Sequence, residues 1–223
     1  MLDDLLDALL PARCPGCGGR GRPLCDGCAT SLHAAPNYPP PAPVDWWTAC
    51  FSYEGAAREL IARAKYRAER RALDFAIPAL VANLAAAPAR PDAVTWIPAS
   101  RARVRAHGLD HGASLARTVA RLTGLPVQRC FERGPGPAQT GRDARARRNG
   151  PELRVVTRSV PPCVLVVDDV ATTGGSLAAA ARALRAAGAE RVLAATLART
   201  RRPGDGAQTG AYTFATPAEP RTA

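Results

Sequence analysis

The sequence predicts an α/β fold with a mainly parallel sheet flanked by helices, preceded by a small cysteine module. Three observations favour this class. Short runs of apolar and β-branched residues alternate with Ala-rich helical stretches from residue 46 to about residue 203. Four cysteines occur as two close pairs near residue 20. A strongly apolar run leads directly into an Asp-Asp pair and a Thr/Gly-rich turn. A length of 223 residues suits one such domain with a small appendage.

The N-terminal segment carries the spacing of a metal site. Residues 14–28 read CPGCGGRGRPLCDGC, a C-x2-C-x7-C-x2-C pattern. In a cytoplasmic protein this pairing favours a metal over disulfides, and four thiolates favour a closed, structural Zn²⁺ site. The predicted ligands are Cys14, Cys17, Cys25 and Cys28, and the alternative is four unconnected free cysteines. We expect a zinc module over residues 1–34 and a Pro-rich linker, APNYPPPAPVD, over 35–45.

The main domain is expected over residues 46–203, followed by a tail over 204–223. Its predicted strands are TACFSY, AVTWI, PVQRCF, LRVV, CVLVVDD and RVLAATLA. Its predicted helices lie around residues 60–61, near 73–84, over 107–123 and over 174–187. Residues 132–150 are too basic, and at their start too rich in Gly and Pro, to belong to the core, so they are expected to form a long functional loop.

The segment VLVVDDVATTGGSL, residues 164–177, is the most informative. An apolar strand buried on both faces places Asp168 and Asp169 at its carboxyl edge, where α/β folds bind ligands. The following turn directs hydroxyl and N–H groups at an anion on a helix N-terminus. Carboxylates would repel a polyphosphate, so they should meet hydroxyls, and a ribose 5-phosphate fits both halves of the site. The alternative is a capping turn with two exposed aspartates.

The charged residues of the sequence exclude some classes of enzyme and indicate candidate anion sites. The formal net charge is +11, and Lys65 is the only lysine. Because Tyr66 follows it, no Gly-Lys-Ser/Thr phosphate loop exists, and no His-Glu-x-x-His zincin motif is present either. One retained lysine among many arginines favours a phosphate contact, with chance as the alternative. Arg101, Arg103 and Arg105 follow the strand AVTWI and form a second candidate anion site.

DDVATTGGS resembles the 5-phosphoribosyl 1-pyrophosphate (PRPP) motif of type I phosphoribosyltransferases. Over about residues 12–200 the chain also resembles the ComF family of competence and GntX-type proteins. That wider resemblance rests on the cysteine module, Lys65-Tyr-Arg, the strand ending at Ile97-Pro98, Arg105-x-His-Gly and Gln139-Thr-Gly-Arg. The chain departs from the family where it has His107-Gly-Leu-Asp-His instead of Arg-Gly-Phe-Asn-Gln.

The resemblance implies a type I phosphoribosyltransferase fold that binds PRPP with Mg²⁺. It implies catalytic roles for Asp168 and Asp169 and a flexible loop over 132–150 that closes on the ligand. The implied PRPP-binding residues are Asp168, Asp169, Val170, Ala171, Thr172, Thr173, Gly174, Gly175 and Ser176. The implied pyrophosphate-binding residues are Lys65, Pro98, Ala99, Ser100, Arg101 and Arg142.

Three functions stay open at this point. The family favours a role in DNA uptake, in which PRPP or single-stranded DNA binds and a competence helicase is the partner. The others are an active transferase of nucleotide or glycan metabolism and a PRPP-sensing regulator. Trp46, Trp47 and Tyr66 could stack on bases, or the tryptophans could belong to the core. The acidic, amphipathic N-terminus and the lack of a long apolar run predict no membrane insertion and a cytoplasmic location.

Overall fold

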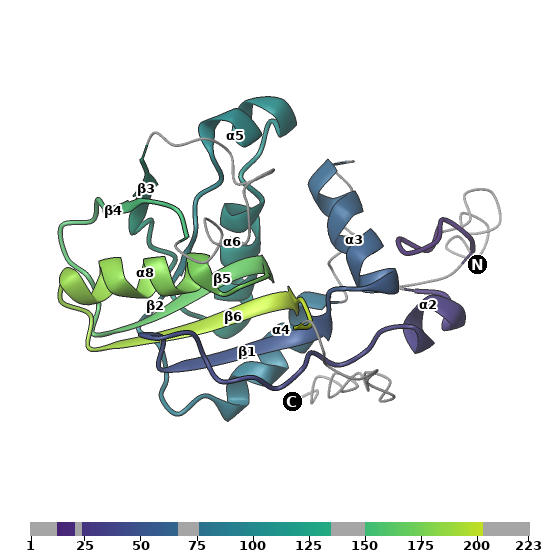
Figure 1. The fold of residues 1–223 in the computed structure, drawn as a ribbon, viewed down its shortest axis with the longest axis horizontal. Coiled ribbons are helices and arrows are strands. Elements are labelled where there is room, and N and C mark those ends of the chain that lie inside the picture. Colours follow the sequence, from purple (N-terminus) through teal and green to yellow (C-terminus); the bar gives the residue numbers. More distant parts are fainter. Residues whose placement is uncertain (1–12, 21–23, 67–75, 135–149, 203–223) are drawn as a thin grey trace, which may run out of the picture.

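A four-stranded parallel sheet forms the centre of the computed structural model, which describes residues 13–20, 24–66, 76–134 and 150–202. The strand order is β1-β6-β5-β2 (Figure 1). The strands are β1 (Trp46–Ser52), β2 (Ala93–Trp96), β5 (Cys163–Ala171) and β6 (Arg191–Arg199). All of them correspond to predicted strands, because each is an apolar run long enough to cross the core.

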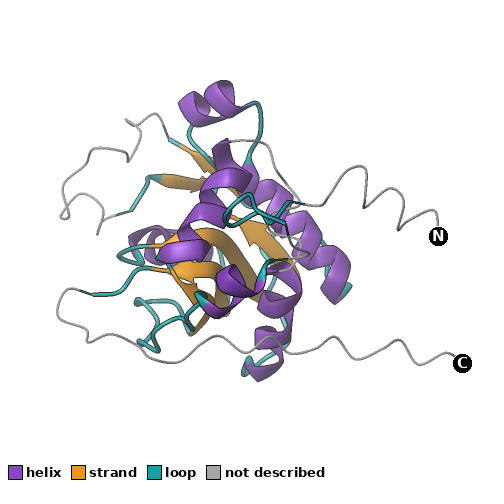
Figure 2. Ribbon diagram, turned by 90° about the vertical axis from the view of Figure 1, so that its right-hand side faces the viewer, coloured by secondary structure: helices purple, strands orange, loops and turns teal. Residues whose placement is uncertain are grey.

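Helices cover both faces of this sheet (Figure 2). The helices are α2 (Asp26–Thr30), α3 (Gly55–Tyr66), α4 (Ala76–Asn83), α5 (Arg101–His107), α6 (His111–Thr123) and α8 (Gly175–Ala186), with the 3₁₀ turn η2 (Leu84–Ala86) after α4. Alternate residues of β5 point to opposite faces. Leu165 and Val167 pack in the core with α4 and α6, and Val164 and Val166 pack in the core with α8. A strand buried on both faces must be apolar, as residues 163–167 of β5 are.

The polar stretch 132–150 begins inside a strand. β3 (Phe131–Arg133) pairs antiparallel with β4 (Leu153–Val155), so Glu132 and Arg133 belong to a short hairpin and the predicted loop boundary is wrong there. The predicted strand PVQRCF contributes only Phe131 to β3, although Val127 bridges to Val94 beside β2. Residues 135–149, with Arg142, lie outside the described residues.

The predicted helix over 107–123 corresponds to α6, which begins four residues later, and a separate helix, α5, precedes it. α5 starts after Ser100, whose Oγ accepts from the Arg103 N–H at 3.3 Å, and ends at Gly108 with φ of 70°. Asp110 then begins α6, because its Oδ1 accepts from the Ala113 N–H at 3.4 Å. α5 escaped prediction because its sequence, RARVRAH, has almost no apolar face.

The Pro-rich segment 35–45 lies along the edge formed by β1, β6 and the start of α8. Val44 is buried, Pro41 packs against Gly174, and the Asp45 N–H donates to the Val192 carbonyl at 2.9 Å. In the part of the chain that the structure describes, no helix has the length and apolar character needed to span a membrane.

Candidate functional site

The two aspartates lie side by side near the carboxyl end of β5. The strand continues to Ala171, so Asp168 pairs in register with Thr196 of β6, and both carboxylates are half-buried. The Asp169 N–H donates to Asp168 Oδ1 at 2.9 Å. The sheet therefore brings two acidic groups to the edge at which ligands bind in parallel α/β proteins.

Lys65, near the end of α3, forms an ion pair with one of them. Its Nζ lies 2.8 Å from Asp169 Oδ2, and the two side chains are only 22% and 20% exposed. α3 stands beside the carboxyl ends of the strands, which places the ammonium over the acidic pair (Figure 1). Burial lowers the pKa of Lys65, but the Asp169 carboxylate outweighs this and raises it above its ordinary value, with help from Asp168 and Tyr53.

Asp168 has a different electrostatic environment. Burial, followed by the charge of Asp169, raises the pKa of Asp168 to about 7. Lys65, the Asp169 N–H and Arg103 act in the opposite direction and do not cancel that effect. The pair therefore consists of one carboxylate held by an ammonium and one carboxyl group that titrates near neutral pH.

The threonine-glycine turn follows directly. Thr172 and Thr173 are exposed, and Thr173 Oγ1 accepts from the Gly175 N–H at 3.3 Å. Gly174 begins α8 with φ of 76°, in the left-handed region that favours glycine. The Thr172 carbonyl accepts from Thr200 Oγ1 at 3.0 Å, which anchors the turn to the end of β6. Two exposed hydroxyls thus stand at the N-terminus of a twelve-residue helix, an arrangement suited to an anion.

Two neighbouring segments pack closely against this turn. A Cβ at Gly174 would lie 2.9 Å from Pro41 Cγ, and a Cβ at Gly150 would overlap the Gly175 carbonyl oxygen. Gly150 also has φ of +73°. The Pro-rich segment and the chain entering β4 therefore fix the backbone of the turn, which keeps its hydroxyls oriented.

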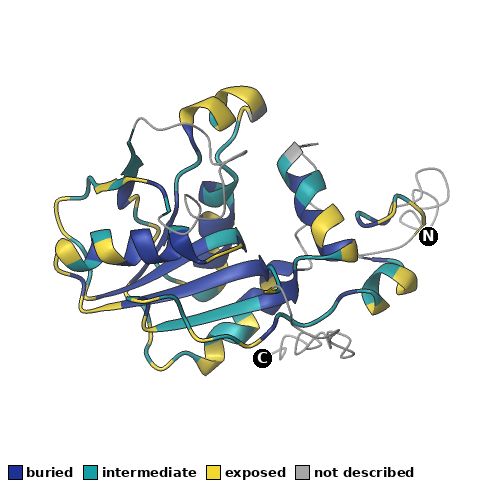
Figure 3. Ribbon diagram, in the orientation of Figure 1, coloured by how far each residue is buried: buried dark blue, intermediate teal, exposed yellow. Residues whose placement is uncertain are grey.

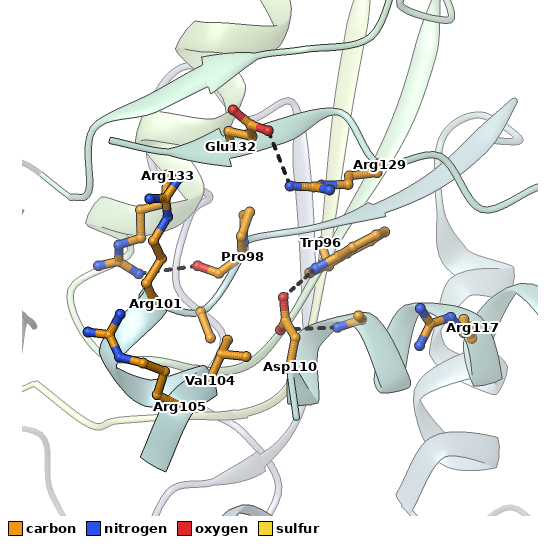
Figure 4. Close-up of a pocket in the computed structure, with 12 residues that line it drawn as sticks. Trp96, Pro98, Arg101, Val104, Arg105, Asp110, Arg117, Arg129, Glu132 and Arg133 are labelled. Atoms are coloured by element: carbon orange, nitrogen blue, oxygen red, sulfur yellow. Dashed lines mark hydrogen bonds and ion pairs between the residues drawn. The ribbon is translucent and has the colours of Figure 1, made fainter. Parts of the chain in front are cut away.

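The segment Pro98–Arg101 connects β2 to α5. Ser100 is buried and its hydroxyl caps α5, so this side chain has a structural use. Pro98, Ala99 and Arg101 line a cavity of about 730 Å³, and Arg133 donates to the Pro98 carbonyl at 3.3 Å (Figure 4). Arg103 acts on the pKa of Asp168, so it lies on the side of α5 that faces the acidic pair.

The four predicted metal ligands form one cluster. Their sulfur atoms all lie within 4.8 Å of one another, and Cys17 Sγ is 3.6 Å from Cys25 Sγ. Backbone N–H groups of Gly16 and Cys25 point at Cys14 Sγ, each at 3.4 Å. Burial acts to raise the pKa of Cys14, but these and a further N–H donor outweigh it and lower that pKa to about 6. Four soft thiolate donors of this spacing could hold a metal ion such as zinc.

The cluster adjoins α3. A Cβ at Gly18 would lie 3.7 Å from the Arg63 guanidinium, and Cys14, Leu24 and Leu32 share one apolar core with Leu60 of α3. The cysteine module therefore packs against the helix that carries Lys65.

The structure also shows a stacked group that sequence reasoning missed. The Arg199 guanidinium lies 3.7 Å from the ring centre of Trp47 and 4.3 Å from that of Tyr38, and it donates to the Pro36 carbonyl at 3.1 Å. Burial, and then Arg202, lower the pKa of Arg199 to about 10. Trp47 Nε1 also donates to Thr196 Oγ1 at 3.1 Å, so this half-buried ring has partners within the protein. No sequence pattern links these residues, because they come from three separate segments: the Pro-rich segment, β1 and β6.

Comparisons with known proteins found one matching family model and similar solved structures. Residues 163–216 match the family model described as the phosphoribosyl transferase domain. A purine phosphoribosyltransferase from Pyrococcus horikoshii Ot3 is similar, with 21% identity and a TM-score of 0.39 over 57% of this chain and 72% of that one. An orotate phosphoribosyltransferase from Aeropyrum pernix has 20% identity and a TM-score of 0.37 over 60% of this chain and 75% of that one. No curated protein matches the chain.

The matched segment contains β5, the acidic pair, the threonine-glycine turn, α8 and β6. The predicted fold class is thus confirmed: a mainly parallel sheet flanked by helices, with a phosphoribosyl transferase segment at its centre and an N-terminal cysteine cluster that could bind a metal.

Proposed function

We propose that this chain binds PRPP at the acidic pair and the threonine-glycine turn, and that it is a type I phosphoribosyltransferase-like protein. One observation carries the proposal. Asp168 and Asp169, with Lys65 bound to Asp169, lie at the carboxyl edge of β5 immediately before two exposed threonines at the N-terminus of α8. Carboxylates suited to hydroxyls and a turn suited to a phosphate are the two halves of a ribose 5-phosphate site.

Each half has a distinct task in this proposal. The 5-phosphate accepts hydrogen bonds from the turn, residues 171–176. The two ribose hydroxyls donate to Asp168 and Asp169, and Lys65 holds the Asp169 side chain in place through their ion pair. When bound, Mg²⁺ neutralises charge on the pyrophosphate. The loop Pro98–Arg101, Lys65 and Arg142 are the proposed pyrophosphate contacts, and Asp168 and Asp169 are the proposed catalytic residues.

Turnover would need no protein nucleophile. As pyrophosphate leaves, positive charge develops on the ribose ring, and the carboxylates stabilise it while the arginines stabilise the leaving group. This electrostatic role suits an active transferase of nucleotide or glycan metabolism. A PRPP-sensing regulator needs the same binding site without an acceptor. Release of pyrophosphate in the presence of a panel of nucleobases and other acceptors separates the two.

Calorimetric titration of PRPP with Mg²⁺ tests the binding proposal. We expect Asp169→Ala to weaken PRPP binding at least about tenfold, because a charge-assisted hydrogen bond contributes about 1.5–3 kcal/mol. Glu190→Gln is the matched control, since Glu190 is exposed and lies at the opposite end of β6. Equal PRPP affinity in the folded Asp169→Ala and Glu190→Gln variants would overturn the proposal.

A second candidate function is the ComF-type role in DNA uptake, in the cytoplasm beside a competence helicase. The exposed arginines of α5 favour it, because they present positive charge for the backbone of single-stranded DNA (Figure 3). Binding of a labelled oligonucleotide, followed by fluorescence anisotropy, should weaken with salt at a log–log slope near −0.7 for each phosphate contacted. No binding at low salt excludes this function, and loss of transformation in a deletion strain supports it.

A further inference from the structure

The backbone of the threonine-glycine turn has to present N–H groups, and not carbonyl groups, to a bound phosphate. A carbonyl oxygen accepts hydrogen bonds and repels an anion, whereas a backbone N–H group donates to one. In a planar trans peptide, the carbonyl of one residue and the N–H of the next point in opposite directions. The groups that hold the carbonyls of the turn therefore also determine which way its N–H groups point.

Thr200 holds two successive carbonyls of this segment. β5 and β6 are parallel neighbours that end at the same edge of the sheet (Figure 1). One residue beyond β6, the Thr200 N–H donates to the Ala171 carbonyl at 3.0 Å, and Thr200 Oγ1 donates to the Thr172 carbonyl at 3.0 Å. Both carbonyls point at Thr200, so the N–H groups of Thr172 and Thr173 point away from it. These two threonines are exposed, and a ligand can reach them.

The two bonds have different origins. The bond to Ala171 continues the parallel pairing of β5 with β6, which a residue of any type except proline could make. The peptide unit between Thr172 and Thr173 lies beyond the end of β5, where strand pairing no longer sets its orientation. The Thr200 hydroxyl supplies the bond there, so only this second contact depends on the residue type at position 200.

Thr200 is itself held in place by its neighbour in sequence. Arg199 is buried, and its register partner on β5 is Ala171. The Arg199 guanidinium stacks on the rings of Trp47 and Tyr38, and it donates to the Tyr38 carbonyl at 3.3 Å. These contacts fix the end of β6 against two other segments of the chain. The stacked group therefore supports the residue from which the Thr200 hydroxyl reaches the turn.

We propose that Thr200 is a positioning residue for phosphate recognition. Its hydroxyl turns the Thr172 carbonyl away from the ligand and thereby directs the Thr173 N–H at the 5-phosphate. Thr200 acts through the turn and not on the ligand itself. The inference rests on the proposed PRPP site, to which it adds a residue from outside the acidic pair and the turn.

Thr200→Val tests the hydroxyl alone. Valine has nearly the same shape as threonine and keeps the backbone N–H bond to Ala171, so the variant loses only the donor to the Thr172 carbonyl. In calorimetric titrations, ribose 5-phosphate should bind the variant roughly three- to tenfold more weakly, the loss expected for one neutral hydrogen bond. Thr200→Ser keeps a hydroxyl and should restore most of the affinity. If Thr200→Val does not fold, Thr200→Ala replaces it.

Two controls separate this role from a general loss of structure. Thr123 Oγ1 also donates to a backbone carbonyl, that of Val119 at 2.9 Å, but it lies at the end of α6. Thr123→Val should therefore bind ribose 5-phosphate as tightly as the native chain does. The proposed pyrophosphate contacts do not include the turn, so pyrophosphate with Mg²⁺ should bind Thr200→Val and the native chain equally.

Proton–nitrogen correlation spectra report on the turn directly. The Thr173 amide proton should move downfield when ribose 5-phosphate is added to the native chain, because it gains a hydrogen bond to an anion. The same addition should move it less in Thr200→Val. A change in fold stability alone would not alter this ligand-dependent shift.

Several results would overturn the role of Thr200. These are native ribose 5-phosphate affinity in Thr200→Val, no recovery in Thr200→Ser, an equal loss in Thr123→Val or in pyrophosphate binding, and a Thr173 amide signal that does not respond to the ligand. If PRPP still binds the native chain, only this inference fails. A native chain that binds neither PRPP nor ribose 5-phosphate overturns the proposed function as well.

Discussion

Lys65 Nζ lies 2.8 Å from Asp169 Oδ2, which joins the only lysine of the chain to the acidic pair of β5. Asp168 and Asp169 are adjacent half-buried acids, and like charges this close raise each other's cost of ionisation. The Lys65 ammonium offsets part of that cost, since it acts to lower the pKa of Asp168. The ion pair therefore allows two carboxyl groups to share one end of a buried strand.

Lys65→Met should destabilise the fold by roughly 1–3 kcal/mol, because it leaves a partly buried carboxylate without its partner. The loss should be larger at pH 8 than at pH 5, since at the lower pH the acidic pair can hold a proton. Urea unfolding at both pH values measures this difference. Arg121→Ala is the control for loss of one positive charge, and an equal effect of the two variants would contradict the role of the ion pair.

Asp168→Asn should change the pH dependence of stability. The pKa of Asp168 is about 7 in the folded chain against an ordinary value of 3.8. Its stabilising contribution is thus complete below pH 3.8 and is lost as pH rises through 7. In the metal-free native chain this loss has a slope of up to about 1.4 kcal/mol per pH unit, which the variant lacks. Parallel unfolding free energies of both proteins from pH 5 to pH 8 would exclude the raised pKa.

The purified protein should contain about one Zn²⁺ per chain, and Cys14→Ser should remove it. A four-cysteine site contributes about 10–16 kcal/mol to its local fold. We expect the module to unfold and the parallel sheet to persist. Elemental analysis of protein purified without chelator measures the metal. Cys130→Ala is the control, because Cys130 is buried far from the cluster in the core with α8, and it should keep its zinc.

Gly150→Ala should cost more stability than Gly124→Ala. Both glycines have a left-handed backbone, with φ of +73° and +69°, so both variants carry about 1–2 kcal/mol of backbone strain. Only at Gly150 would the new Cβ overlap the Gly175 carbonyl, whereas Gly124 has nothing within 4 Å. The overlap adds roughly 1–3 kcal/mol. Similar unfolding free energies of the two variants would show that the close approach of Gly150 to α8 is not rigid.

The strands and the threonine-glycine turn could be predicted from the sequence, and the side-chain partners could not. β5 and β6 are mostly apolar because both of their faces are buried, and Gly174 marks the start of α8 by its backbone requirement. α5 was not predicted because it has no apolar stripe. Its bounds are set by capping groups, and its side chains are mostly exposed to solvent. The local signal for the true start of α6 was Asp110, a residue type that caps helices.

The side-chain partners that could not be predicted from the sequence are contacts between distant segments of the chain. Lys65 meets Asp169 only because α3 stands at the carboxyl edge of the sheet, and no local pattern encodes that position. Arg199 stacks on Trp47 although the sheet register pairs Arg199 with Ser52 and Trp47 with Ala194. The predicted cysteine cluster is the exception, since metal-ligand spacing is itself a local pattern. The roles of the PRPP and pyrophosphate residues stay predictions.

Arg63 and Lys65 lie two positions apart on α3, and their side chains leave the helix in different directions. The first lies against the cysteine module at Gly18, and the second holds Asp169. The two residues lie less than one helical turn apart, so one short stretch of α3 contacts both the cysteine module and the acidic pair.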